Sequence, residues 1–537
     1  MPSLFSHLAD LILAKPGALS KIILVLMAIS LFGMTMVSMS TGNENYLQPT
    51  STEGILDNHY SDTFKKDSLI ILIESGDSTS PSLLKYIDTI EKPISNLQYI
   101  SSVSSIVDIV KSLNNQMIPT SSGEMNIVLE KVPESAIKSY APTGMLTMVP
   151  VNLESGLSLD KRKTALKNLQ NFIDSTDLPP GVSITITGTA AFKQEMEVEM
   201  GKSLGVLISA AMVLMVIVLG LLFGYVNHRF LPVVIVAFGL IFTFGFVGLA
   251  GMQISMAVIS AFPVIIGLGI DYAIQFHSRL EEEARDHPLP DAIKTTVTKT
   301  GPAVLYAMLA TCMGFIAMFL SPVPMMQGFG LVSIIGVITC YITSLIGIPL
   351  IATLINYKPK GHGASKFATV VDTSLSNMAV FIAKRSVPIL LITLLFAIIG
   401  LQLDPMIPVD TNEKAFVPPD MPAKATLDKV TRTIGSTDSV PIMIRGSDVV
   451  TIKALEWMQE FIDFELKTKT KITRSSSILD YLQAYNNGVL PKTQSELDQV
   501  LGKIPENIKE TYLRGNNEAL FEFNTVKIET KTKSDLK

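Results

Sequence analysis

Long apolar segments alternate with polar ones along the 537 residues of this chain. A helix rises ~1.5 Å per residue, so a run of about 20 apolar residues crosses the ~30 Å hydrocarbon core of a bilayer. Seven runs reach about this length, and we predict that each is a membrane span. The predicted spans are approximately Leu19 to Ser38, Ser203 to Tyr225, Phe230 to Leu249, Ile254 to Phe276, Ala303 to Leu320, Gly328 to Tyr357 and Val387 to Leu403.

The composition agrees with a membrane protein. Hydrophobic residues make up 48% of the chain and charged residues 17%, and the mean hydropathy is +0.40. The net charge of −5 and the lack of a basic block argue against a nucleic-acid partner. Cys312 and Cys340 lie inside apolar runs without a second Cys or His at ligand spacing, so we predict neither a disulfide framework nor a metal site.

The basic residues of the short connections set the orientation. They precede the first and seventh spans and lie between the second and third and between the fourth and fifth, which places all of them on one side. Short basic loops stay in the cytoplasm, so we predict a multi-pass protein of the cell membrane with two long polar segments outside. The residues are Lys15, Lys21, Arg229, Arg279, Arg285, Lys294, Lys299, Lys358, Lys360, Lys366, Lys384 and Arg385.

The chain contains an internal repeat. Residues 67–73 match 438–444, residues 104–108 match 476–480, and residues 131–134 match 503–506, at offsets of 371, 372 and 372. Ala14-Lys15 before the first span likewise matches Ala383-Lys384 before the seventh. The matches predict a parallel duplication, as in many transporters. At this offset Lys537 corresponds to residue 165, so we expect the second copy to be incomplete and five further spans to be missing.

The predicted fold class is an α-helical polytopic membrane protein with α+β extracytoplasmic domains. Between Leu69 and Thr187 the pattern reads strand, helix, strand, strand, helix, strand, which is the split βαβ, ferredoxin-like arrangement. The predicted parts are a cytoplasmic interfacial segment (1–18), span 1 (19–38), a first porter-like domain (39–202), spans 2–6 (203–357), a cytoplasmic linker with an amphipathic helix (358–386), span 7 (387–403) and an incomplete second porter-like domain (404–537).

Asp271 is the only carboxylate within the apolar stretches of predicted spans 2 to 6. A charged Asp at bilayer depth costs roughly 2.5 to 3.5 kcal/mol on insertion scales, so it needs a partner or a function. Apolar surroundings favour the neutral acid and a nearby cation favours the carboxylate, so the group can exchange a proton when its surroundings change. Helical spacing places Gly267 and Gln275 on its stripe, which we expect to face protein, and Gly269 allows close helix approach.

Tyr272, about 100° around the helix from Asp271, is expected to offer a phenolic hydrogen bond to a neighbouring span. The alternative interpretation is that Asp271 makes only a fixed interhelical hydrogen bond or ion pair.

The fourth to sixth spans resemble a known family of exporters. The chain is similar to the hydrophobe/amphiphile efflux and MMPL-type branch of the resistance-nodulation-division (RND) superfamily. The segments that carry this resemblance are Gly267-Leu268-Gly269-Ile270-Asp271-Tyr272 followed by Arg279-Leu280-Glu281-Glu282-Glu283, Thr300-Gly301-Pro302-Ala303, Thr311 with Gly314-Phe315, and Gln327-Gly328-Phe329-Gly330.

The resemblance implies a twelve-span secondary transporter, not an enzyme, that exports hydrophobic or amphiphilic molecules. Membrane lipids are its expected partners. It implies that Asp271 is the protonatable group, that Tyr272 is its hydrogen-bonding neighbour and that Thr311 is a polar contact from the fifth span. Polar partners from the tenth span are expected near position 643, beyond this sequence. The expected coupling ion is the proton, with sodium left open; no other cofactor is expected, and a homo-oligomer stays open.

Three further expectations are weaker in the sequence. Glu195 and Glu199 share a helix face before the second span and either line a substrate or proton entry or, on the simpler interpretation, form a solvated surface. Pro263 is expected to kink the fourth span. Two other function classes remain: a sterol-sensing or receptor-type protein of the Patched kind, and an accessory motor of protein secretion of the SecD and SecF kind, whose fourth-span residues differ after the Asp.

Overall fold

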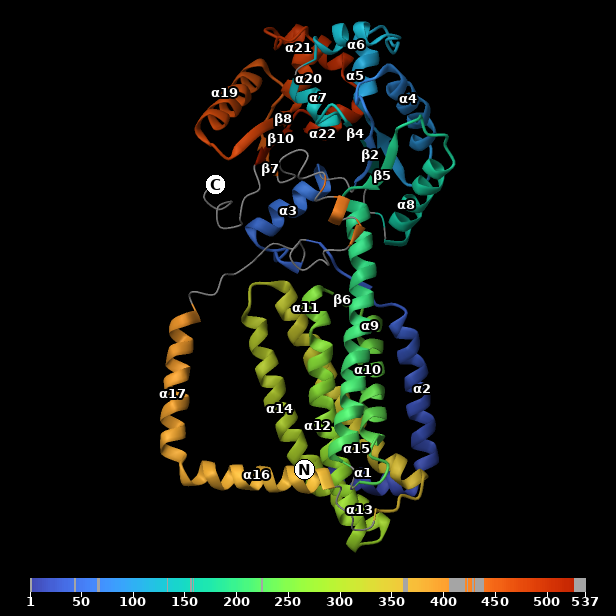
Figure 1. Ribbon diagram of the computed structural model, residues 1–537, viewed down its shortest axis with the longest axis vertical. Coiled ribbons are helices and arrows are strands. Elements are labelled where there is room, and N and C mark those ends of the chain that lie inside the picture. The colour runs from blue at the N-terminus through green and yellow to red at the C-terminus, as the bar shows by residue number, and fades with distance from the viewer. Residues whose placement is uncertain are drawn as a thin grey trace. The chain divides into compact units, whose positions relative to one another are not determined.

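The computed structural model divides the chain into two compact units. A helical unit comprises Met1–Ser51 and Glu197–Val409, and an α/β unit comprises Thr52–Met196 and Asp410–Lys537 (Figure 1). The structure describes residues 2–42, 45–64, 68–132, 134–154, 157, 159–223, 226–360, 366–404, 421–422, 424–426, 429 and 439–525. Most of the segment 404–438 and the last twelve residues therefore lie outside the described part.

Seven helices in the described part are long and apolar enough to cross a membrane, and they coincide with the seven predicted spans. The elements of the helical unit are α1 (Pro2–Ala14), α2 (Pro16–Met34), β1 (Ser38–Met39), α9 (Thr189–Leu222), α10 (Leu231–Leu249), β6 (Gln253–Ile254), α11 (Met256–Ile259), α12 (Ala261–Asp286), α13 (Leu289–Thr295), η2 (Thr296–Thr300), α14 (Gly301–Ile316), η3 (Ala317–Leu320), α15 (Pro324–Leu354), α16 (Lys366–Lys384) and α17 (Ser386–Leu403). The predicted amphipathic segments at Met1 to Leu13 and Phe367 to Ile382 are helices α1 and α16.

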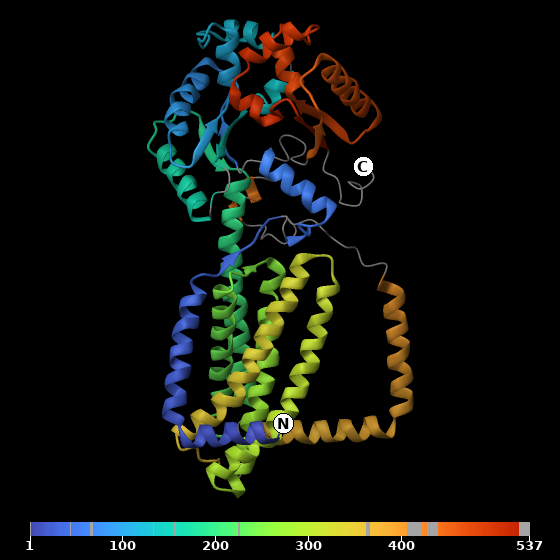
Figure 2. The same cartoon turned by 180° about the vertical axis from the view of Figure 1, so that it is seen from behind.

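Helix α15 forms the packing centre of this unit, with α10, α12 and α14 against it, and α10 packs in turn on α2 (Figure 2). Small residues make the α2 contact close: a Cβ added at Gly248 would lie 1.9 Å from the carbonyl oxygen of Gly33, and one at Gly245 would lie 2.4 Å from Ser30 Cα. Such close backbone approach is the usual role of small residues between membrane helices. Phe244 and Phe262 stack between α10 and α12, with ring centroids 4.2 Å apart.

The fourth span is interrupted before its proline. Helix α11 ends at Ile259 and α12 begins at Ala261, so the break lies at Ser260. Pro263 then falls in the first turn of α12, where its missing N–H removes no intrahelical hydrogen bond. Ser260 itself keeps right-handed helical backbone angles, and the kink predicted from Pro263 stays a prediction.

The α/β unit contains two four-stranded sheets. The first part comprises α3 (Thr52–Thr63), β2 (Ser68–Glu74), α4 (Pro81–Ser95), β3 (Ile100–Val103), α5 (Ile106–Leu113), α6 (Ser122–Leu129), α7 (Glu134–Tyr140), β4 (Leu146–Leu153), α8 (Leu159–Asp174) and β5 (Ser183–Thr187). The second comprises β7 (Ser439–Arg445), α19 (Ile452–Thr468), β8 (Ile472–Ser477), α20 (Ile478–Ala484), α21 (Gln494–Lys503), α22 (Glu506–Tyr512), β9 (Leu513–Arg514) and β10 (Glu518–Thr525).

The two sheets are built in the same way. The first has the order β3-β4-β2-β5, and the second has β8-β10-β7, with β9 also pairing β10; every pairing is antiparallel. In the first sheet, β4 lies between β2 and β3. In the second sheet, β10 lies in the same way between β7 and β8. The helix after the second strand starts with a capping box in both parts, Ser105 with Asp108 and Ser477 with Asp480. Buried residues of both sheets belong to one hydrophobic cluster.

Helix α3 precedes the first sheet in sequence but binds the second. His59 Nε2 lies 3.0 Å from both carboxylate oxygens of Glu518 on β10, and Tyr60 Oη donates to Glu522 Oε1 over 3.1 Å. Lys429 makes the reverse connection. It precedes the second sheet in sequence, and its Nζ lies 2.5 Å from Oε1 of Glu74 on β2 of the first sheet. The segment that precedes each sheet in sequence therefore binds the other sheet.

Candidate proton site on helix α12

One face of α12 packs inside the helical unit and sets the direction of Asp271. Tyr272 and Ala273 are buried, and a Cβ added at Gly269 would lie 2.7 Å from Cys340 Sγ on α15. The α15 side of the helix is therefore closed, as the expectation for Gly269 required. Asp271 lies on the opposite side of α12 from Gly269, away from this contact, and is exposed.

The stripe that carries Asp271 is open. Gly267, Asp271 and Gln275 are all exposed, and a Cβ added at Gly267 would meet no atom within 4 Å. Gln275 Nε2 donates a hydrogen bond to Asp271 Oδ2 over 2.8 Å. Within the described part of the chain, α10 and α15 pack against the other side of α12, and the expectation that the stripe faces protein stays a prediction.

The structure separates Tyr272 from Asp271. The Tyr272 side chain is buried, and its hydroxyl has no hydrogen-bond partner of normal geometry among the described residues, although Thr311 of α14 is near it. Thr311 Oγ1 instead donates to the carbonyl oxygen of Ala307, 3.0 Å away. The Tyr272 hydroxyl thus lies near Thr311 on the buried side of α12, whereas Asp271 lies on the exposed side.

Chemically, the arrangement suits proton exchange. A carboxylate at the middle of an apolar helix is unfavourable, and Asp271 receives a single hydrogen bond from a side chain of its own helix. With so few donors inside the chain, its protonation state depends on whatever covers the open stripe. Among the described residues, no group of three or more His, Cys, Asp or Glu side chains is arranged to hold a metal ion.

A buried polar cluster ten residues further along α12 has no counterpart in the sequence predictions. Glu281 is 1% exposed, His277 is 2% exposed and Tyr357, just after α15, is 3% exposed. Tyr357 Oη donates to Glu281 Oε2 and lies 3.3 Å from His277 Nε2. Burial, followed by the hydrogen bond to Glu281, raises the pKa of Tyr357 far above its usual value, so the hydroxyl keeps its proton.

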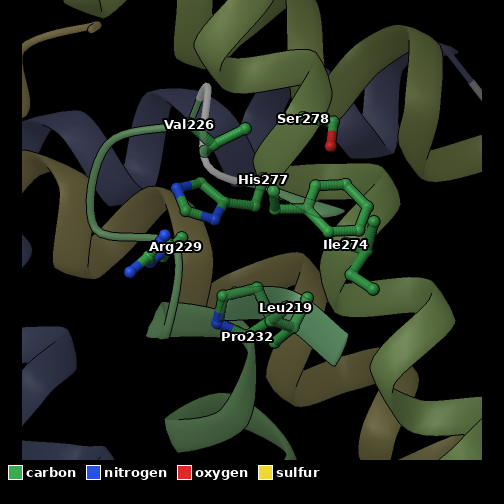
Figure 3. Close-up of a pocket in the computed structure, with 8 residues that line it drawn as sticks. Leu219, Val226, Arg229, Pro232, Ile274, His277 and Ser278 are labelled. Carbon is green, nitrogen blue, oxygen red and sulfur yellow. The ribbon is translucent and has the colours of Figure 1, made fainter. Parts of the chain in front are cut away.

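The sequence did contain a signal for this cluster. Ala273, His277 and Glu281 follow one another at intervals of four residues, which places the two polar residues on the buried face of α12. Within the run Glu281-Glu282-Glu283, Glu281 is buried and Glu282 is exposed. A small hollow beside the cluster is lined by Leu219, Phe223, Val226, Arg229, Pro232, Ile274, His277 and Ser278 (Figure 3).

The other predicted carboxylates do not join this site. Glu195 and Glu199 lie on α9 and are half-buried. Glu199 forms an ion pair with Lys202 one turn along the same helix.

The α/β unit holds a different kind of buried acid. Glu91 on α4 has one carboxylate oxygen, Oε1, that is buried without a hydrogen-bond partner among the described residues. Burial, and then the charge of Asp108, raise the pKa of Glu91 to about 8. Lys111, whose positive charge favours a nearby carboxylate, is paired with Asp88, with its Nζ 2.5 Å from Oδ1. Glu91 is therefore neutral at pH 7, whereas Glu281 has four donors around it.

Seven span-length apolar helices in the described part, one of them with a single acid in its apolar stretch, define a multi-pass membrane protein. The profile of the MMPL family matches residues 59–394. The chain is 31% identical to "Putative membrane protein MJ1562" of Methanocaldococcus jannaschii over 280 residues, which cover 52% of this chain and 72% of that protein. The chain thus belongs to the MMPL family, whose members are transporters rather than classical enzymes. The resemblance inferred from the fourth span is confirmed at this level.

Proposed function

We propose that this protein is a secondary active exporter of hydrophobic or amphiphilic molecules, driven by the proton gradient. The observation that carries the proposal is Asp271: an acid in the middle of an apolar helix, on an open stripe, with one hydrogen bond from its own helix. Family membership supports transport as the general activity. The coupling ion and the class of substrate are parts of the proposal.

Protonation of Asp271 removes a charge and changes which partners the open stripe of α12 prefers. A proton that crosses ~100 mV supplies ~2.3 kcal/mol, which shifts a two-state equilibrium nearly fiftyfold. This is enough to bias the helical unit between two arrangements. The α/β unit, placed outside by the basic loops, then accepts the substrate from the membrane or its outer leaflet.

We further propose that the two sheets are copies in a duplicated transporter. Their common strand order, their capping boxes at an offset of 372 and the sequence matches support this interpretation. On this interpretation α17 is the equivalent of α2. Helix α2 packs on α10, whereas α17 buries none of its described residues. A second set of spans would pack against α17 and cover the stripe of Asp271.

The proposal is tested with the protein from its complete reading frame, reconstituted in vesicles with a fluorescent phospholipid analogue and a cationic amphiphilic dye as probes. We expect a pH gradient to drive movement of at least one probe, and Asp271→Asn to abolish the gradient-dependent part. Glu282→Gln on the same helix, whose side chain is 67% exposed, is the matched control. Equal transport after collapse of both pH gradient and voltage rejects the proposal. Saturable lipid binding without vectorial movement favours a lipid-sensing protein instead.

A further inference from the structure

The cluster around Glu281 joins three separate segments of the helical unit. The Oε1 atom of Glu281 accepts from the backbone N–H of Lys360 at 2.8 Å and from Arg285 Nη2 at 3.3 Å. The Oε2 atom accepts from Tyr357 Oη and from the backbone N–H of Asn227 at 3.4 Å. Glu281 belongs to α12, Asn227 to the connection between α9 and α10, and Tyr357 and Lys360 to the segment after α15. One side chain thus fastens α12 to both neighbours.

The chemistry of this contact is that of a fixed anion. Two of its four donors are backbone N–H groups, which cannot rotate away, and Arg285 adds a positive charge. The other ionisable side chains at the cluster are His277 and His228, whose rings each lie 5.8 Å from that of Tyr357. Removal of any of these partners leaves a buried polar group less satisfied.

The cluster also defines which part of α12 can move. Ten residues separate Glu281 from Asp271, or ~15 Å along a helix. At the far end, the break at Ser260 separates α12 from α11. Between these two points lies the open stripe of Asp271, where a Cβ at Gly267 would meet nothing within 4 Å. The helix is therefore fastened at the Glu281 end and unrestrained on one side around Asp271.

We propose that Glu281 and Tyr357 are positioning residues for transport: they hold the C-terminal end of α12 in place, so that the proton-dependent movement of the Asp271 segment pivots there. This inference rests on the proposed function for the role of Asp271. It adds a second carboxylate to the mechanism, one that fastens the helix and is distinct from the proposed proton site. It also assigns a role to the segment after α15, whose only other predicted role is that of a linker.

The test compares Tyr357→Phe and Glu281→Gln with the control Glu282→Gln in the complete protein. Tyr357→Phe removes one hydroxyl and keeps the ring, so it tests the contact even if Glu281→Gln fails to fold. Three quantities are measured: the thermal unfolding midpoint, the infrared titration of the Asp271 carboxyl obtained by subtraction of Asp271→Asn spectra, and gradient-driven probe movement per folded molecule. The infrared measurement does not require a transported substrate.

We expect Tyr357→Phe to shift the Asp271 titration midpoint and to lower transport by roughly 2- to 30-fold, the range over which coupled networks alter such equilibria. Glu282→Gln should change neither. The positioning role is overturned if both cluster variants lower the unfolding midpoint but leave the Asp271 titration and the transport per folded molecule unchanged. Absence of gradient-dependent transport in the unaltered protein overturns the proposed function instead, and the titration still decides whether Glu281 and Tyr357 position Asp271.

Discussion

Helix α12 carries two carboxylates whose surroundings are opposite. Glu281 is buried and receives hydrogen bonds from four donors on three segments, whereas Asp271 is exposed and receives one from Gln275 of its own helix. A fully satisfied buried charge specifies how segments pack, and its removal is destabilising. Asp271, which receives a single hydrogen bond from its own helix, contributes little to packing. One helix thus carries a carboxylate that fastens its C-terminal end to neighbouring segments and another that lies exposed near its middle.

The largest expected effect comes from replacing Glu281, the acid that accepts hydrogen bonds from four donors. Glu281→Ala leaves Arg285 and two backbone N–H groups without their acceptor, which we expect to cost about 3 to 5 kcal/mol of the free energy of unfolding. Asp271→Ala removes no buried contact and should change it by less than about 0.5 kcal/mol. Unfolding in detergent, followed by circular dichroism, measures both. A loss at Asp271 as large as that at Glu281 would show that the open stripe is covered in the folded protein.

Glu91 of the α/β unit is the intermediate case, an acid that is buried without enough donors. Its pKa of about 8 in the folded state lies above the ordinary value of 4.5, so the folded state binds the proton more tightly than the unfolded state. This stabilisation is complete below pH 4.5 and is lost as the pH rises through 8, by up to ~1.4 kcal/mol per pH unit. Glu91→Gln should remove the dependence and make the protein more stable than the parent at pH 8.5.

The single tryptophan gives a measurement for this prediction. Trp457 lies on α19 and stacks on Phe461, with ring centroids 5.4 Å apart, and Phe461 packs against Phe521 of β10. Because both sheets share one core, unfolding of the α/β unit should change the fluorescence of Trp457. The parent and Glu91→Gln are compared at pH 5 and pH 8.5. An equal pH dependence in both would mean that other groups, not Glu91, titrate in this window.

The same contrast between closed and open surroundings exists in the backbone of α12. Gly269→Ala places a Cβ 2.7 Å from Cys340 Sγ, and overpacking of this kind costs about 1 to 3 kcal/mol. Gly267→Ala meets nothing within 4 Å, so it should stabilise the helix by about 0.5 to 1 kcal/mol through its higher helix propensity. Thermal unfolding of the two variants side by side measures the difference. Destabilisation by Gly267→Ala would reveal a second surface against this face.

The sequence predicted the spans because hydropathy is a local property of each segment. It placed the start of the second span at Ser203, whereas α9 begins at Thr189, because the additional turns are polar and a hydropathy pattern does not detect them. It also predicted the strands of the first sheet, where apolar alternation is regular. For example, β2 runs from Ser68 to Glu74 against the predicted Leu69 to Glu74.

Long-range pairings could not be predicted in this way. Nothing in the sequence of α3 indicates that His59 and Tyr60 bind the second sheet rather than the first, since their partners Glu518 and Glu522 lie more than 450 positions away. The surroundings of Asp271 are a long-range property of the same kind. Helical spacing shows which residues share a stripe, but the neighbours α10 and α15 decide which stripe is buried.

The smallest expected effect concerns Glu199, which separates the two interpretations of the carboxylates before the second span. Its partner Lys202 is 65% exposed, and an ion pair of this kind contributes about 0 to 1 kcal/mol, so Glu199→Gln should hardly change the free energy of unfolding. A solvated helix surface also predicts unchanged transport. A role in substrate entry predicts a raised KM with an unchanged kcat, because only binding before the transport step would be weakened. Probe uptake measured over a range of probe concentrations distinguishes the two. We expect the solvated surface, because Glu199, unlike Asp271, already has an opposite charge beside it on its own helix.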